Sequence, residues 1–235
     1  ADLPAQNLTY SLSGTDAALF QIDATTGVLS FKTAPDFEAP LDANGDNVYE
    51  LLVRVSDGTL VGTQTLAISV SNRNEMPQGS DGHIAVAEDG AHVFTLADFG
   101  FIDGMDSPGN GLASVQIVSA PAKGVFLSGG APVIDGQWIS AGDIAAGRLI
   151  FSPAANDNGA AYAALVFRVR DDGGTLDGGV DTEVGVHTLT IDVTPVNDAP
   201  VITRAAFEAV QDGATSLGAD AIAVTDVDSD ASAIR

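Results

Sequence analysis

Hydrophobic and polar residues alternate with a period close to two along several short segments. The alternation runs through residues 51–56, 66–71, 115–118, 165–169 and 189–193, and Gly, Asn, Asp and Pro separate these segments. This pattern is typical of short strands with one buried face. Many short strands with frequent turns predict an all-β sandwich.

One segment departs from this pattern. Residues 139–148 read ISAGDIAAGR, which predicts a short helix. Ser140 stands where a helix N-cap is expected, because its hydroxyl can accept a hydrogen bond from an unpaired backbone N–H of the first turn.

The same motifs occur twice, near the end of each of two units. Residues 53–58 (VRVSDG) match residues 167–173 (FRVRDDG), and residues 68–77 (ISVSNRNEMP) match residues 191–200 (IDVTPVNDAP). Each unit therefore ends with a strand, a turn, a second strand and a stiff Pro-containing link. This arrangement predicts a tandem array with units at 1–77 and 78–200 and the beginning of a third at 201–235.

The composition excludes several classes of protein. Asp and Glu number 32 against 9 Lys and Arg, and the net charge of −23 disfavours nucleic acid and anionic membranes as partners. The chain has no Cys, which excludes thiol catalysis, zinc–thiolate sites and disulfides. No apolar run approaches the ~18 residues of a membrane span, so no membrane insertion is expected. Since the sequence begins with Ala1 rather than Met and shows no signal peptide, we interpret it as a fragment of a longer protein.

Acidic residues gather at turns and between the units. Ca²⁺ takes six to eight oxygen ligands from carboxylates, amides and backbone carbonyls, and these clusters supply such groups. Any single Asp is more simply read as a turn former, because Asp bonds its own backbone. Clustering of like charges favours a bound cation instead, since close carboxylates repel.

One loop partly matches an EF-hand. Asp42, Asn44 and Asp46 occupy the first, third and fifth positions, but Asn47 and Val53 stand where Gly and Glu are required. No helices flank the loop, so we expect an ordinary solvated loop.

The first unit resembles a bacterial cadherin-like repeat. The resemblance covers residues 1–77 and is carried by LTYSLSG at 8–14, FQID at 20–23, TGVL at 26–29, DFE at 36–38, VRVSDG at 53–58 and NRNEMP at 72–77. It implies that the first strand of this unit is missing and that Asp2 ends its Asp-x-Asp motif.

The second unit is similar to the cadherin-like or immunoglobulin-like tandem repeats of giant secreted bacterial adhesins, many of the RTX type, and to those of the NG2 proteoglycan. Its markers are LADFGF at 96–101, PAKG at 121–124, GDIAAGRL at 142–149, FSPAAN at 151–156, DDGG at 171–174 and VNDAP at 196–200. TDVDSD at 225–230 resembles the Asp-x-Asp motif of a third repeat. The implied fold is all-β, with tandem cadherin-like (immunoglobulin-like Greek-key) sandwich domains.

The resemblance also implies Ca²⁺ at each junction between repeats. The implied ligands are Asp36, Glu38, Asn74, Glu75, Asp103 and Asp171 at the first junction, and Glu88, Asn197, Asp198, Asp226 and Asp228 at the second. Asp57 and Asp2 would serve a junction upstream. The sequence departs from the family at Asn72 and Pro195, where acids are expected, at Asn156-Asp-Asn158 in place of Asp-x-Glu, and at the spacing of Asp103-Gly-Met-Asp106.

The expected function is a calcium-stiffened structural spacer of a large secreted or bacterial-surface adhesin, supporting cell or biofilm adhesion. Its partners would be neighbouring repeats of the same polypeptide, with a polysaccharide or cell-surface ligand bound through other domains. We expect no enzyme, because His83, His92 and His187 lack metal-ligand spacing and no nucleophile elbow or phosphate loop occurs.

The alternative is a carbohydrate-binding module. Trp138 and Tyr162 on one sandwich face could stack on a sugar ring. Packing of Trp138 within a strand or at a sheet edge is the more favoured interpretation.

Overall fold

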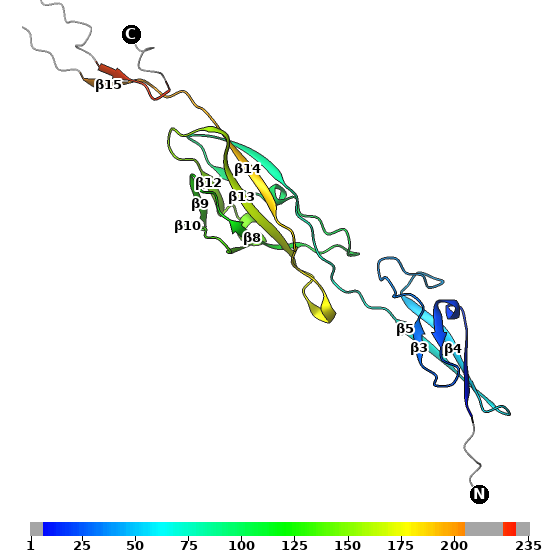
Figure 1. The fold of residues 1–235 in the computed structure, drawn as a ribbon. Helices are drawn as coiled ribbons and strands as arrows, with labels where there is room; N and C mark the ends of the chain where they lie inside the picture. The colour runs from blue at the N-terminus through cyan, green and yellow to red at the C-terminus, as the bar shows by residue number, and fades with distance from the viewer. Residues whose placement is uncertain (1–6, 205–222, 229–235) are drawn as a thin grey trace, which may run out of the picture. The chain divides into compact units, whose positions relative to one another are not determined.

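The computed structural model describes residues 7–204 and 223–228 (Figure 1). Strands dominate these residues, and the predicted all-β fold is confirmed. The chain divides into two compact units. Unit 1 comprises residues 1–77, 103–111 and 171–181, and unit 2 comprises residues 78–102, 112–170 and 182–235.

Unit 1 contains one sheet of three strands and one of two. The larger sheet has the order β1 (Thr9–Ser13), β4 (Val48–Ser56) and β5 (Val61–Ser69), all antiparallel. A 3-10 turn, η1 (Ala17–Leu19), precedes the pair β2 (Phe20–Ile22) and β3 (Leu29–Phe31).

The core of unit 1 is small and aromatic. Phe20, Tyr49 and Leu51 are buried, and the ring centroids of Phe20 and Phe31 lie 4.1 Å apart. Since side chains alternate along a strand, Tyr49 and Leu51 reach the same face of β4. Two buried aromatic rings and a leucine each contribute roughly 1.5–3 kcal/mol of burial free energy.

Unit 2 is a sandwich of a five-stranded and a four-stranded sheet, with the orders β11-β8-β13-β14-β6 and β10-β9-β12-β7. β14 pairs with β6 in parallel, whereas β13 with β14, β11 with β8, and β9 with β10 and β12 pair antiparallel, as does β12 with β7. The bounds are β6 Gly82–Ala87, β7 His92–Val93, η2 Leu96–Phe99, β8 Leu112–Ser119, β9 Val125–Ser128, β10 Ala131–Pro132, β11 Trp138–Ser140, α1 Ala141–Ala145, β12 Leu149–Ser152, β13 Gly159–Asp171 and β14 His187–Thr194. A further 3-10 turn, η3 (Leu176–Gly178), lies in the loop 171–181 of unit 1.

The core of unit 2 lies between its two sheets. Leu165, Phe167 and Val169 are completely buried, whereas Arg168 and Arg170 alternate with them on the other face of β13. Phe99 packs edge-on against Phe167 with centroids 5.0 Å apart. The alternation predicted for residues 165–169 is therefore confirmed.

The helix α1 begins as predicted and ends earlier. The Ser140 hydroxyl accepts a hydrogen bond from the backbone N–H of Asp143 at 3.0 Å, which is the expected N-cap. The helix ends at Ala145 rather than near residue 148. Gly147 has φ 69°, a left-handed conformation that stops a helix and that glycine adopts readily.

Beyond these sheets, β15 (Val201–Arg204) pairs antiparallel with β16 (Ala223–Thr225). The repeat boundaries at 77 and 200 stay predictions. Asp2 and Asp230 lie outside the described residues. Within the described part of the chain, no helix is long and apolar enough to cross a membrane.

Candidate metal centre

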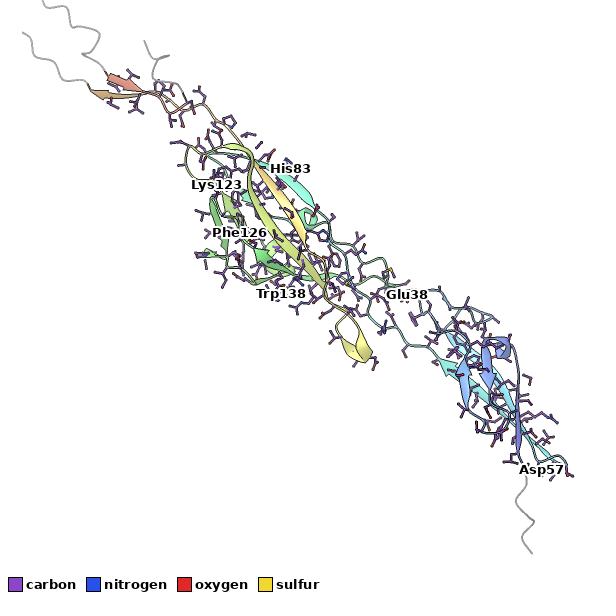
Figure 2. The ribbon with its side chains drawn as sticks, viewed as in Figure 1. Glu38, Asp57, His83, Lys123, Phe126 and Trp138 are labelled. Atoms are coloured by element: carbon purple, nitrogen blue, oxygen red, sulfur yellow. The ribbon has the colours of Figure 1, made fainter. Side chains whose placement is uncertain are left out.

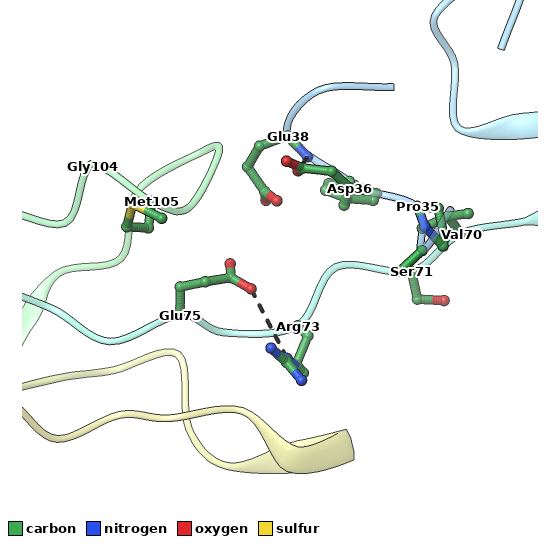
Figure 3. A pocket seen from close by; sticks show the side chains of 11 residues that line it. Pro35, Asp36, Glu38, Val70, Ser71, Arg73, Glu75, Gly104 and Met105 are labelled. Carbon is green, nitrogen blue, oxygen red and sulfur yellow. Dashed lines mark hydrogen bonds and ion pairs between the residues drawn. The ribbon is translucent and has the colours of Figure 1, made fainter. Parts of the chain in front are cut away.

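Three carboxylates of unit 1 converge on one point. Oxygen atoms of Glu38, Glu75 and Asp106 all lie within 4.8 Å of one another. Glu38 precedes β4, Glu75 follows β5, and Asp106 belongs to the loop 103–111. Figure 3 shows the side chains of Glu38 and Glu75 extending into the same space, beside a pocket of about 690 Å³.

Local hydrogen bonds fix the loop that carries Glu38. The Oδ1 atom of Asp36 accepts hydrogen bonds from the backbone N–H groups of Glu38 (3.0 Å) and Ala39 (3.2 Å), which closes a turn. The Asn47 side chain donates to the Phe37 carbonyl at 2.8 Å. One carboxylate oxygen of Asp36 is thus used to position Glu38.

Asp106 binds the segment that carries Glu75. Its Oδ2 atom accepts a hydrogen bond from the Glu75 backbone N–H at 2.9 Å, and its Oδ1 atom accepts one from the Asn72 side chain at 3.3 Å. Asp106 is 6% exposed. The chain therefore holds a buried carboxylate beside Glu75 despite the repulsion between them.

The electrostatics of the cluster favour a cation. The pKa of Glu75 is raised, mainly by burial and then by the charges of Asp106 and Glu38, while Arg73 opposes the rise from 4.0 Å. The Oε1 atom of Glu38 and the Oε2 atom of Glu75 are buried without a hydrogen-bond partner. Buried unpaired oxygens and close like charges both cost stability, and a hard divalent cation would remove both costs.

A second polar group in unit 1 surrounds Asn74. Its Nδ2 atom donates to Asp171 Oδ1 (3.0 Å) and to the carbonyls of Gly174 (3.1 Å) and Val180 (3.0 Å). Its Oδ1 atom accepts from the Asn110 side chain at 2.5 Å. Asn74 therefore connects the segment after β5 to the loops 103–111 and 171–181.

Two carboxylates in this group keep one buried oxygen each without a hydrogen-bond partner, Oδ1 of Asp103 and Oδ2 of Asp171. The pKa of Asp171 is raised, chiefly by burial and in smaller part by the charge of Asp103. Hydrogen bonds from Gly173 and Asn74 act in the opposite direction. These two oxygens are further candidates for metal ligation.

Unit 2 holds a separate acidic group. Glu88 accepts hydrogen bonds from the Asn158 side chain (2.9 Å) and the Val196 backbone N–H (2.7 Å), and these bonds lower its pKa. The Asp198 backbone N–H donates to Asp228. The pKa of Asp198 is raised by burial first and then by neighbouring acids, which include Asp228 and Glu88.

The remaining residues of this second set lie in the same group. The Asn197 side chain donates to the Asp198 carbonyl at 2.9 Å, and Asp226 accepts from the Asp228 backbone N–H at 3.1 Å. The Oδ2 atom of Asp198 is buried without a hydrogen-bond partner. Asn197 and Asp228 also line a pocket of about 570 Å³.

The sequence-based ligand set and the geometry overlap in part. Glu38 and Glu75 meet as the set implies, but the third carboxylate is Asp106, which the set omitted in favour of Asp103. The predicted ligand set also did not include Asn72, Asn110 and Asn158, whose side chains donate hydrogen bonds within these groups. The Asp103-Gly-Met-Asp106 spacing was the available signal for Asp106. Metal ligation by the predicted residues stays a prediction.

The EF-hand-like loop closes on itself. Asp42 accepts hydrogen bonds from the backbone N–H groups of Asp46 (2.9 Å) and Asn47 (3.1 Å). Residues 43–46 are exposed, as expected for an ordinary solvated loop, whereas Asp42 is buried and its carboxylate closes the turn.

The prediction that Trp138 and Tyr162 lie on one sandwich face, where both could stack on a sugar ring, is wrong. Tyr162 is 7% exposed and belongs to the core of unit 2, and its hydroxyl accepts a hydrogen bond from the Ala154 N–H. Trp138, labelled in Figure 2, lies in β11 next to Ile139. Ile139 is buried in the core, so Trp138 points to the opposite face. The two rings therefore share no face, and packing of Trp138 within a strand is confirmed.

No protein-family model matches the sequence, and no curated protein matches it. Solved structures do match its fold. The human protocadherin-24 EC1-2 structure aligns with 83% of this chain and 85% of its own, at 19% identity and a TM-score of 0.54. A second crystal form covers 82% and 84% at 20% identity and a TM-score of 0.53. Mouse protocadherin-24 EC1-3 covers 95% and 68% at 20% identity and a TM-score of 0.50.

At these identities the likeness establishes the fold. The chain has the cadherin-like β-sandwich fold, in agreement with the fold implied by its sequence motifs.

Proposed function

We propose that this chain is a calcium-stiffened spacer segment of a large extracellular adhesin, secreted or displayed on a bacterial surface and similar to the RTX type. The observation that carries the proposal is the convergence of Glu38, Glu75 and Asp106 with two buried, unpartnered oxygen atoms. The cadherin-like fold and the acidic motifs between repeats support it. The role is structural, and its partners are the neighbouring repeats of the same polypeptide.

Calcium would act by joining segments distant in sequence. Residues Ile102 and Leu112 on either side of the loop 103–111 belong to unit 2, whereas the loop itself belongs to unit 1. An ion held by Asp106 together with Glu38 and Glu75 would fix this loop to unit 1. Without the ion, repulsion among the three carboxylates would favour separation.

The energy available is large relative to the stability of a domain. A site with a dissociation constant 100-fold below the ambient Ca²⁺ concentration contributes about 2.7 kcal/mol. The free energy of unfolding of a domain is roughly 5–15 kcal/mol, so a few such sites would contribute a large share of it. In a chain without Cys, bound metal would take the place of disulfides.

Calorimetric titration with Ca²⁺ tests the proposal directly. We expect binding that the double variant Glu38→Gln/Glu75→Gln weakens at least about tenfold, since two charged ligands are lost. Glu50→Gln is the matched control, because Glu50 is exposed on β4. Equal binding by the double variant and the control would contradict the proposal for this cluster.

A further inference from the structure

One face of the five-stranded sheet in unit 2, the face away from the core, carries a patch of polar and aromatic side chains. The patch consists of Trp138, Gln116, Arg168 and Arg170. Trp138 and Gln116 are paired neighbours on β11 and β8, and β13 lies on the other side of β8. Ile139, Val115, Ile117, Phe167 and Val169, which alternate with these four residues, are buried in the core, so the four side chains lie on the opposite face. We call these residues the Arg–Trp face.

The two arginines have no acidic partner among the residues that the structure describes, although the chain has 32 acids. Arg148 and Lys123 each form an ion pair with an aspartate. In the described part of the chain, the guanidinium groups of Arg168 and Arg170 form no ion pair with an acid, and the Nε atom of each is buried without a hydrogen-bond partner. Among residues 7–204 and 223–228, no acid is therefore paired with either guanidinium group.

Stacking holds one guanidinium group in place. The Cζ atom of Arg170 lies 4.0 Å from the centroid of the Trp138 ring. Such stacking orients a guanidinium group without using its N–H donors, which stay available for an anion. Both arginines are only half buried, so part of each side chain is accessible to a ligand.

We propose that the Arg–Trp face binds an acidic polysaccharide whose sugar rings carry carboxylates. A guanidinium group matches a carboxylate through two parallel hydrogen bonds. Arg168 and Arg170 are two residues apart on an extended strand, about 7 Å along it, so they can meet separate carboxylates of one extended chain.

The surroundings fit such a polymer. Gln116 and Thr190 lie on the same face and offer amide and hydroxyl groups for sugar hydroxyls. Asp192, an acid on this face, is engaged by His83 at 2.9 Å. The net charge of −23 opposes an anionic polymer over most of the surface, so attraction here would depend on the two arginines. An acidic peptide would more readily add to a sheet edge than lie across a face.

The test is binding of polygalacturonate to the whole chain by biolayer interferometry, in EDTA so that calcium cannot bridge two anions. We expect binding that weakens with added salt, and that Arg168→Gln/Arg170→Gln weakens at least about tenfold. The affinity of Arg168→Lys/Arg170→Lys should lie between those of the wild type and the double Gln variant. Lysine keeps the positive charge but lacks the two parallel N–H donors of a guanidinium group. The matched control Arg148→Gln, which removes an arginine of the same unit, should bind as the wild type does.

Several outcomes would overturn the proposal. One is that Arg148→Gln weakens polygalacturonate binding as much as the double Gln variant does. Another is that the double Gln variant keeps the wild-type melting temperature and binds polygalacturonate as the wild type does. A third is that neutral dextran binds as strongly as polygalacturonate. Arginine-dependent binding of polyglutamate as strong as that of polygalacturonate would also overturn it, in favour of an acidic peptide partner. Loss of calcium binding alone would leave it standing, since the assay contains no free calcium.

Discussion

The pKa of Glu75 lies above its ordinary value because burial and two neighbouring carboxylates disfavour its charged form. A raised pKa in the folded state means that folding is favoured when this group is protonated. Its contribution to stability is therefore lost as the pH rises above about 4.3 and through the raised pKa. Bound Ca²⁺ would compensate the charge and remove this loss.

Replacement of the ionisable group exposes this effect. In EDTA, the free energy of unfolding of the wild type should fall relative to that of Glu75→Gln as the pH rises from about 4 to 7. Urea denaturation at several pH values measures the difference. Glu50→Gln should show no such trend relative to the wild type, and a pH-independent difference for Glu75→Gln would contradict the argument.

Asn74 is buried where the segment after β5 meets the loops 103–111 and 171–181, and its removal would leave Asp171 and two backbone carbonyls without their donor. Asn74→Ala should lower the free energy of unfolding by about 1–3 kcal/mol, the cost of unsatisfied buried groups. Urea denaturation provides the measurement. Asn44→Ala, in an exposed loop, should change stability by less than about 0.5 kcal/mol; a similar loss in both variants would contradict the role given to Asn74.

At the scale of single residues, the sequence identified two of the three carboxylates that lie close together, Glu38 and Glu75, but not the third. Glu38 and Glu75 follow from short motifs that keep their spacing. Asp103 and Asp106 are three residues apart in one loop, and which of them meets Glu75 depends on the path of that loop. The motif could not distinguish them.

At the scale of elements, α1 provides a direct test of local prediction. The Ser140 hydroxyl caps the helix and also donates to the Asp143 carboxylate at 2.7 Å. Ser140→Ala should destabilise the chain by about 0.5–2 kcal/mol, measured by urea denaturation. Ser119→Ala, at an exposed strand end, should change stability by less than about 0.5 kcal/mol. An unchanged stability for Ser140→Ala would refute the capping role.

Strand length decided which elements the sequence revealed. β4, β13 and β14 have eight to thirteen residues, enough to show a period of two. β7, β9, β10 and β12 have two to four residues each, too few for a period, and the four-stranded sheet was not found. A strand of this length is defined by its partners rather than by its own pattern.

At the scale of the whole molecule, the repeated motifs predicted a tandem array, and the cadherin-like fold agrees with it. The sequence did not predict that the loops 103–111 and 171–181 belong to unit 1. Such an assignment depends on contacts between residues far apart in the chain, among them those of Asn74. No local pattern encodes these contacts.

Small-angle X-ray scattering in millimolar Ca²⁺ and in EGTA tests the central claim most directly. If shared carboxylates bind calcium and stiffen the chain, the radius of gyration should rise with Ca²⁺ and fall again with EGTA. The variant Glu38→Gln/Glu75→Gln should respond less, and Glu50→Gln should respond as the wild type does. Identical scattering curves for the wild type in both conditions would contradict calcium stiffening.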